Sequence, residues 1–435
     1  MKYSISDSKA PVMPNLGSGT EAIKLLLSQA SKDMYEPLVP MLFPVLGAHL
    51  CGVTFQYPDF SMKEMTGMMA HLVADSGCNK GQLTLLVEAL CRDLRQHDDG
   101  ELRKLVEWQK QIKTKSSNSA KPVRPEVAFW FPPSDVTNAA FIQNAMACES
   151  LGNRSQYLNM TEVEMADRVC GGHKQVSQMM RNIYDKARAG ALRATADGIT
   201  GNPTLRVNLT FSSTPFAARQ FYKYELLNGT FGRVVFSYKP RIDRDGRIPR
   251  LGKFSEEFYR KLDAYLARLD ICKGEFVIKP LNNLIDRLSI EWGDYSDLAD
   301  DNLIFDVGKR SLVSAWKAGC ILWVLNGQTW TRAMGEMVEW LVYHDIWSKM
   351  QLFADMLFKD ANPLDEAQRR GPRNMLEDLP DSFNEKQLEA LRVSLGKSPE
   401  GTGAQLRKWV FRKFVTFCAQ TGLYTKTDEY LKGKS

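Results

Sequence analysis

The sequence predicts an α/β protein whose parallel sheet lies between two helical regions. Apolar runs of strand length alternate with helical patterns over residues 68–238, and this alternation is typical of a parallel sheet. Apolar residues recur at helical spacing before residue 53 and after residue 254. Hydrophobic residues make up 44% of the chain and charged residues 25%, which is ordinary globular usage and excludes a disordered or fibrous protein.

The elements follow one another in a clear order. A polar arm over residues 1–20 precedes helices over residues 21–53. Five strand candidates come next, at residues 68–74, 126–131, 157–160, 204–211 and 233–238. Helical spacing is found at residues 83–95, 139–148, 258–269, 312–323, 337–358 and 386–395. The basic, Ser-rich stretch Lys110–Arg124 is expected to be a linker.

Four regions follow from this order. We expect a helical N-terminal region, an α/β domain, a helical domain and a small C-terminal module. Their boundaries are placed at residues 1–60, 61–250, 251–375 and 376–435.

Cysteine, histidine and apolar patterns narrow the class of protein. The eight cysteines contain no CxxC pair, so we expect reduced thiols rather than a disulfide framework. The five histidines are equally dispersed and support neither a zinc site nor an HExxH protease. Residues 1–15 lack the apolar stretch of a secretory signal, and the run at residues 38–53 is too short and too interrupted to span a membrane. We therefore expect a soluble cytoplasmic protein without a membrane partner.

The segment ADSGCNKG at residues 74–81 follows a strand candidate and opens a helix. Such a loop directs backbone N–H groups and the positive helix end toward an anion, and a lysine at its end reaches nucleotide phosphates. Lys80 stands in that place. Against GxxxxGK[ST], however, Ala74, Asn79 and Gly81 replace Gly, Gly and Ser/Thr. By itself the loop is more typical of an ordinary strand-to-helix turn.

Further segments downstream change this interpretation. They are Ser134–Asn138, Tyr157–Asp167 (YLNMTEVEMAD), Leu209–Pro215 (LTFSSTP) and Gly229–Arg241 (GTFGRVVFSYKPR). With the loop, this ordered series resembles a family of P-loop ATPases of unknown function, which are helicase- or primase-like proteins of plasmids, prophages and conjugative or mobilisable elements. The resemblance covers roughly residues 35–345 and is most specific from Thr161 to Arg241. It implies a RecA/AAA-like P-loop NTPase core, with ATP and Mg²⁺ as cofactors and a homo-oligomer, often a ring, as the assembly.

The resemblance also implies the residues of a nucleotide site. Lys80 would be the phosphate-loop lysine, Gly81 is usual in the family, and Asn79 replaces a glycine, at a place where we expect a positive φ. Ser213 and Thr214 resemble the polar sensor after the next strand. The full cofactor-binding set is Ser76, Gly77, Cys78, Asn79, Lys80, Gly81, Gln82, Ser213 and Thr214.

Three charged residues would carry the catalysis. Glu162 and Glu164 resemble the acidic pair that holds Mg²⁺ and polarises the attacking water, although the family more often has Asp in the second place. A solvated helix start is the other interpretation of this pair. Arg233 resembles an arginine that could act as a finger toward a neighbouring subunit, and a surface salt bridge is its equal alternative.

Two basic segments are candidates for DNA binding. The first contains Lys174, Arg181, Lys186, Arg188 and Arg193, which would face a nucleic-acid channel or, more commonly for such a pattern, only solvent. The second contains Arg407, Lys408, Arg412 and Lys413 on a helix predicted over Ala404–Thr421. With the helix in Ser382–Gly396 and a wing at Gly422–Lys426, this helix gives a winged-helix outline. A helical pair docked on the rest of the protein is equally compatible.

The sequence thus favours an ATPase that couples nucleotide hydrolysis to DNA remodelling or helicase-like work for a mobile genetic element. The retained Lys80, Glu162 and Arg233 favour this enzyme. The rival is a non-hydrolysing DNA-binding scaffold or adaptor, favoured by Asn79 and by the missing Mg²⁺-binding hydroxyl at Gly81. A transposase or integrase is less well supported, because no acidic triad or Tyr/Arg constellation stands out.

Overall fold

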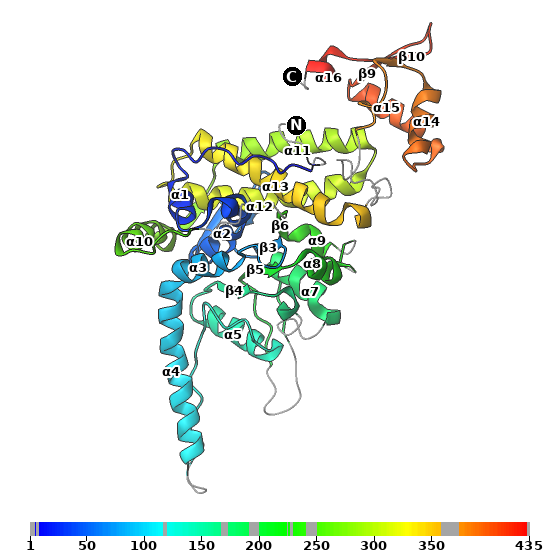
Figure 1. Cartoon of the computed structure of the whole chain (residues 1–435). Helices are drawn as coiled ribbons and strands as arrows, with labels where there is room; N and C mark the ends of the chain where they lie inside the picture. The colour runs from blue at the N-terminus through cyan, green and yellow to red at the C-terminus, as the bar shows by residue number, and fades with distance from the viewer. Residues whose placement is uncertain are drawn as a thin grey trace. The chain divides into compact units, whose positions relative to one another are not determined.

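The computed structural model describes most of the chain, and Figure 1 labels most of its helices and several of its strands. The described residues are 5, 8–115, 120–166, 173–190, 200–223, 225–226, 229–240, 250–357 and 374–432, without the side chains of 173–177, 429 and 432. The chain divides into two compact units. Unit 1 comprises Met1–Met13, Asn282–Trp316 and Met337–Ser435, and unit 2 comprises Pro14–Leu281 and Lys317–Glu336.

A parallel sheet of four strands forms the centre of unit 2. In chain order the strands are β3 (Met69–Ala74), β4 (Gln156–Met160), β5 (Val207–Ser213) and β6 (Val235–Lys239), and their order across the sheet is β4-β5-β3-β6. All three pairings are parallel. Every residue of β3 and β5 is buried, as expected for central strands that are covered on both faces. The predicted α/β class with a parallel sheet is confirmed.

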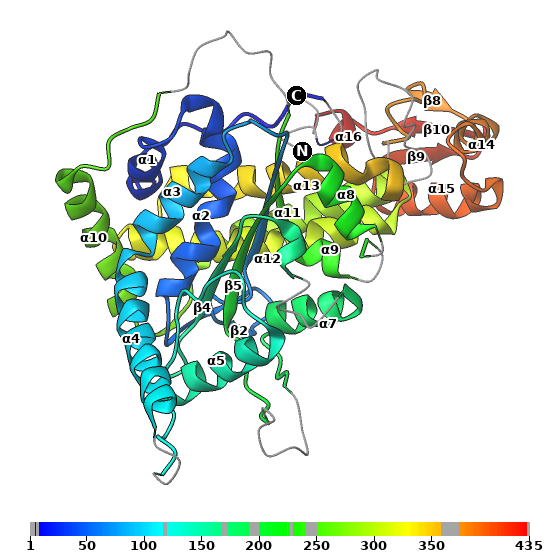
Figure 2. The same cartoon turned by 60° about the horizontal axis from the view of Figure 1, so that its bottom comes forward.

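Helices cover both faces of this sheet (Figure 2). On one face α2 (Tyr35–His49) packs across all four strands and is buried from Pro37 to His49, because it is apolar on every side. Gly47 permits this close approach, since a Cβ there would lie 2.9 Å from the main-chain oxygen of Met65. Beside α2 lie α1 (Glu21–Leu27), α3 (Gly81–Leu90) and α10 (Glu256–Ile271). The other face carries α7 (His173–Tyr184), α8 (Pro215–Tyr222) and α9 (Thr230–Arg233).

The predicted strand at Glu126–Phe131 is wrong, because the chain forms no strand there. The carboxylate of Asp98 accepts hydrogen bonds from the N–H groups of Trp130 and Phe131, at 2.8 and 2.7 Å. Asp98 belongs to α4 (Arg92–Thr114), so a helix side chain satisfies donors that a strand ladder would otherwise use. The segment nevertheless runs beside β4, where the N–H of Tyr157 donates to the carbonyl of Trp130 at 2.8 Å.

Two further differences from the predicted elements are found in unit 2. The predicted linker Lys110–Arg124 begins inside a helix, because α4 continues to Thr114 through Lys and Gln residues that favour helices. A second sheet, which the sequence did not reveal, has the order β2-β1-β7 and is built from β1 (Val53–Gln56), β2 (Met62–Lys63) and β7 (Gly274–Phe276). The helix α5 (Asn138–Ser150) agrees with the predicted one.

Three long helices follow α10, and two of them were predicted. They are α11 (Lys279–Ala299), which the periodicity analysis missed, α12 (Asn302–Leu325) and α13 (Arg332–Leu357). Among the residues that the structure describes, no helix combines the length and the apolar character that a membrane span requires.

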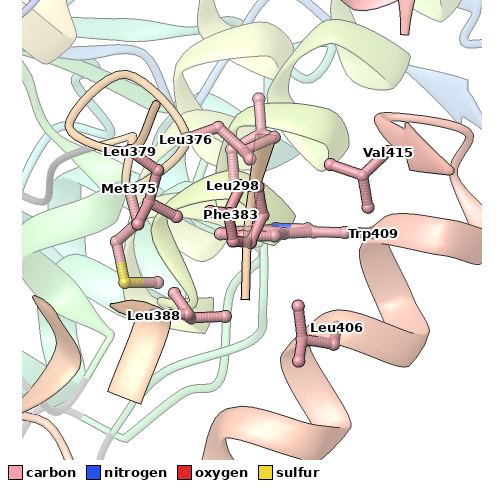
Figure 3. Packing of buried hydrophobic residues seen from close by; sticks show 9 residues of the cluster. All are labelled: Leu298, Met375, Leu376, Leu379, Phe383, Leu388, Leu406, Trp409 and Val415. Carbon is pink, nitrogen blue, oxygen red and sulfur yellow. The ribbon is translucent and has the colours of Figure 1, made fainter. Parts of the chain in front are cut away.

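The C-terminal module, residues 374–432, belongs to unit 1. Its elements are β8 (Ser382–Phe383), α14 (Glu385–Ser394), α15 (Thr402–Phe411), β9 (Val415–Cys418), β10 (Leu423–Lys426) and α16 (Asp428–Lys432). The strands form an antiparallel sheet in the order β8-β10-β9. Trp409 and Phe383 lie at the centre of a buried apolar cluster that Leu298 of α11 completes (Figure 3).

The predicted helix at Ala404–Thr421 is therefore too long, since α15 ends at Phe411. Lys413 has a φ of 60°, a left-handed conformation that helices do not continue through. The residues that follow Lys413 in the sequence form β9. This strand pairs with β10, which lies where the wing was expected.

Candidate functional site

The loop between β3 and α3 lies at the carboxyl edge of the parallel sheet. Gly77 and Asn79 have φ values of 75° and 62°, and the helix begins two residues after Asn79. The positive φ expected at Asn79 is therefore present, and asparagine tolerates this conformation better than most other non-glycine residues do. A Cβ added to Gly81 would meet nothing within 4 Å, so the first turn of α3 is open on that side.

Lys80 connects this loop to the two central strands. Its Nζ donates hydrogen bonds to the main-chain oxygens of Ala74, at 2.6 Å, and Ser213, at 3.2 Å. Partial burial lowers the pKa of Lys80, while the carboxylate of Glu162 acts in the opposite direction and favours the charged ammonium. Lys80 and Glu162 are therefore within electrostatic reach of each other.

The topology explains why these residues meet. Parallel strands bring their carboxyl ends to one edge of the sheet, and β5 lies between β3 and β4. Glu162 precedes the short 3₁₀ helix η2 (Val163–Met165), just after β4, and both it and Glu164 are exposed. Thr214 follows β5 and caps α8 by accepting the N–H of Ala217 at 3.3 Å. The loop, Glu162, Ser213 and Thr214 thus share this edge.

His71 is a site residue that the sequence analysis missed. From inside β3 its Nε2 contacts the Oγ of Ser213 at 2.8 Å, and its Nδ1 contacts the hydroxyl of Tyr222 at 3.2 Å. Full burial lowers the pKa of His71 to about 3, so the ring is neutral at physiological pH. The Ser213 hydroxyl in turn donates to the carbonyl of Thr214 at 3.1 Å, so His71 acts as the donor to Ser213. The sequence feature that could have indicated this residue is a histidine inside the otherwise apolar run MMAHLVA.

Arg233 is not brought to this edge. It stands two residues before β6, whose first residue pairs with Ala70, near the amino end of β3. Its guanidinium contacts the carboxylate of Asp185 at 2.9 Å and the carbonyl of Gly229 at 2.8 Å. In this structure Arg233 therefore forms the salt bridge that was the alternative to an arginine finger.

The first basic segment is only partly available to a ligand. Lys186 forms an ion pair with Glu64 at 2.7 Å, and Arg181 donates to Gln178 at 3.0 Å. Arg188 is exposed. The side chain of Lys174 and the whole of Arg193 lie outside the described residues.

The second basic segment divides into two pairs. Lys408 and Arg412 both contact the carboxylate of Asp297 on α11, at 2.9 and 2.8 Å. Arg407 and Lys413 are exposed. One side of α15 is therefore docked on α11, and the remaining two cations face solvent.

A cavity of about 570 Å³ lies elsewhere in unit 2. It is lined by α4, α5 and the segment between them, with Phe129, Phe141 and Asp98 among its residues. The loop residues 75–81 do not line it, so this cavity is separate from the carboxyl-edge site.

Comparison with known proteins adds no assignment to this geometry. No model of a protein family matches the chain, and no curated protein matches its sequence.

Proposed function

We propose that this chain is a P-loop NTPase that binds ATP at the loop between β3 and α3 and hydrolyses it with Mg²⁺. The observation that carries the proposal is the loop itself, in which two left-handed residues, Gly77 and Asn79, lead to Lys80 at the start of a helix. The N-terminal N–H groups of that helix and the lysine ammonium supply positive potential for a triphosphate. The open first turn at Gly81 leaves space for its oxygens.

The acidic residues support a hydrolytic role. Glu162 and Glu164 follow β4 at the same carboxyl edge and are exposed, and carboxylate oxygens suit Mg²⁺, which would neutralise charge on the phosphates. Glu162 would accept the proton of a water molecule that attacks the γ-phosphorus, while the bond to the bridging oxygen breaks and ADP leaves. Gly81 contributes no hydroxyl, so these carboxylates carry more of the metal binding than they would beside a Ser or Thr.

DNA is the proposed second partner. The order β8-α14-α15-β9-β10 in the C-terminal module supports the proposal of a winged helix. Arg407 and Lys413 on and after α15 are exposed cations that suit phosphate contacts. Together with the resemblance to helicase- and primase-like proteins of mobile elements, this supports ATP-driven DNA remodelling by a cytoplasmic homo-oligomer.

A specific observation favours the non-hydrolysing adaptor as the second candidate. The Lys80 ammonium already has three main-chain oxygen partners, on Ala74, Asp75 and Ser213, and a bound triphosphate must compete with them. Asn79 adds a side chain where the resembling family has none. Absence of nucleotide binding would follow if these two features dominated.

One experiment separates the two candidates. ATP binding is measured by calorimetry, and Mg²⁺-dependent phosphate release is measured with and without DNA. We expect wild type to bind and hydrolyse ATP, and Glu162→Gln to bind it without turnover. Glu257→Gln, which changes an exposed carboxylate on α10, is the matched control and should retain activity. Absence of ATP binding in wild type would favour the non-hydrolysing adaptor, and binding without turnover, even with DNA present, would indicate a nucleotide-gated switch instead of an ATPase.

A further inference from the structure

A cluster of three side chains that can bind a metal, one histidine and two aspartates, lies at the far end of α3 from the loop between β3 and α3. His49 is the last residue of α2, Asp93 lies in the first turn of α4, and Asp270 lies near the end of α10. The ring nitrogen Nδ1 of His49 is 3.4 Å from a carboxylate oxygen of Asp270 and 3.8 Å from one of Asp93. Since α3 has 10 residues, this cluster is separated from the loop by about 15 Å of helix.

His49 points to a ligand rather than to an ordinary buried contact. Its side chain is fully buried, and its Nε2 is 3.0 Å from the carbonyl oxygen of Leu90, where it must be the donor. In the neutral ring the lone pair is then on Nδ1, which has no hydrogen-bond partner among the described residues. A histidine that binds a metal commonly has this arrangement, with one nitrogen donating to a main-chain oxygen and the other facing the ion.

The carboxylates complete the donor set. The facing oxygen of Asp270 is also buried without a hydrogen-bond partner in the described part of the chain. Asp93 is half exposed, which leaves a path from solvent and room for water as a further ligand. The three ligand atoms all lie within 4.8 Å of one another. Around a tetrahedral Zn²⁺ with bonds of about 2.1 Å, ligand atoms lie about 3.4 Å apart, so the three side chains need to move only slightly toward one another.

The local charge also suits a divalent cation. The cluster contains two carboxylates, and Asp270 forms an ion pair with Arg154, whose guanidinium is 3.8 Å away and lies over the ring of Trp130. One arginine does not neutralise two aspartates. A mixed imidazole and carboxylate set favours a first-row transition-metal ion over Mg²⁺ or Ca²⁺, which prefer oxygen ligands alone.

We propose that His49, Asp93 and Asp270 bind a divalent transition-metal ion that ties the ends of α2 and α10 to the start of α4. The site does not depend on the proposed ATPase function. Its ligands come from three distant positions of the sequence, so the spacing of histidines and cysteines could not have revealed it.

The test uses Zn²⁺ alone on the full, untagged chain after chelator treatment. A Cys418→Ser background removes an exposed thiol that would also take up Zn²⁺. Asp93→Asn removes one ligand charge at a half-exposed position and should preserve the fold. Asp263→Asn is the matched control, because Asp263 is equally exposed and its ion pair with Arg92 lies outside the cluster. Calorimetry and equilibrium dialysis give affinity and stoichiometry, and visible absorption with Co²⁺ reports the ligand geometry.

We expect one ion per chain in the background and in the control, and at least about tenfold weaker binding in Asp93→Asn. Zn²⁺ should raise the melting temperature of the Cys418→Ser background and of the Asp263→Asn control more than that of Asp93→Asn. Equal affinity in all three proteins, or no uptake at millimolar Zn²⁺, would overturn the proposal and leave His49 as the partner of an ordinary ion pair.

Discussion

The Nζ of Lys80 lies 3.2 Å from the main-chain oxygen of Ser213, so a single side chain joins the loop between β3 and α3 to the end of β5. The same ammonium bonds the end of β3 through Ala74. Lys80 therefore has a structural role in addition to the proposed one, and tests of the site must separate the two.

Lys80→Met should weaken ATP binding by roughly ten- to a hundredfold, equivalent to about 1.5–3 kcal/mol for a lost charge-assisted contact. Methionine retains most of the aliphatic stem, so packing changes little. Calorimetry gives the affinity, and urea unfolding shows whether both proteins are folded under the same conditions. Indistinguishable ATP titrations of the two folded proteins would mean that the loop is vestigial.

Gly81→Ser should increase Mg²⁺-dependent turnover, because it places a hydroxyl at the start of α3 where the structure has open space. Replacing a glycine within a helix also stabilises it, by about 0.5–1 kcal/mol for alanine. Gly81→Ala is therefore the control, since it supplies the helix effect without the hydroxyl. Steady-state phosphate release should rise in the serine variant alone; an equal rise in both would assign the gain to helix stability.

Arg233→Ala should leave ATP affinity unchanged, because Arg233 precedes β6 and lies away from the carboxyl edge. Its coupling with Asp185 in a double-mutant cycle with Asp185→Asn should be no more than about 1 kcal/mol, since Asp185 is 47% exposed. Urea unfolding of the four proteins measures this coupling. Mixing Arg233→Ala with Glu162→Gln subunits tests the arginine finger directly. Recovery of turnover in the mixture would show that Arg233 acts across a subunit interface after all.

Acid should destabilise the protein partly through His71. Its pKa is about 3 in the folded chain against 6.5 for the free group, so between these values the unfolded chain binds a proton that the folded chain does not. Each pH unit of acidification within this window then costs up to about 1.4 kcal/mol. His71→Gln should show a shallower fall of unfolding free energy with pH, and His344→Gln should do so independently, because burial also lowers the pKa of His344 to about 3. An unchanged slope in His71→Gln would show that the ring is protonated in the folded state.

Neutralising Arg407 and Lys413 together should weaken DNA binding and reduce the slope of log affinity against log salt by about 2. Neutralising Lys408 and Arg412 should instead destabilise the docking of α15 on Asp297. Fluorescence anisotropy over a range of salt concentrations measures the first effect, and thermal unfolding the second. If the first pair changed neither affinity nor slope, the C-terminal module would have no part in DNA binding.

The central sheet could be predicted from the sequence because buried parallel strands appear as continuous apolar runs. Glu126–Phe131 is also an apolar run, but the N–H groups of Trp130 and Phe131 donate to the carboxylate of Asp98. No local sequence pattern predicts that a helix side chain will accept these hydrogen bonds. The strand β1 was missed because it is short and pairs with Gly274, far along the chain.

The carboxyl-edge site was partly predictable. Strand order brings Lys80, Glu162 and Ser213 to one edge, and their positions after successive strands are visible in the sequence. The support of Ser213 by His71 could not be predicted, because it depends on which residues of β3 and β5 lie side by side. The end of α15 was predicted too late because the segment WVFRKFVTFC fits both a helical and a strand pattern. The left-handed conformation of Lys413, which ends the helix, is not visible in that pattern.

The apolar cluster around Trp409 affects how the C-terminal module can be isolated. Leu298 completes that cluster, and the main-chain oxygen of Asp297 accepts the indole N–H of Trp409 at 3.1 Å. A fragment comprising residues 374–432 alone would lack both, and would expose an apolar surface and an unbonded indole at once. Self-association of such a fragment would give no information on whether the whole protein is an oligomer. The intact chain is therefore the appropriate reagent for studying what this module binds.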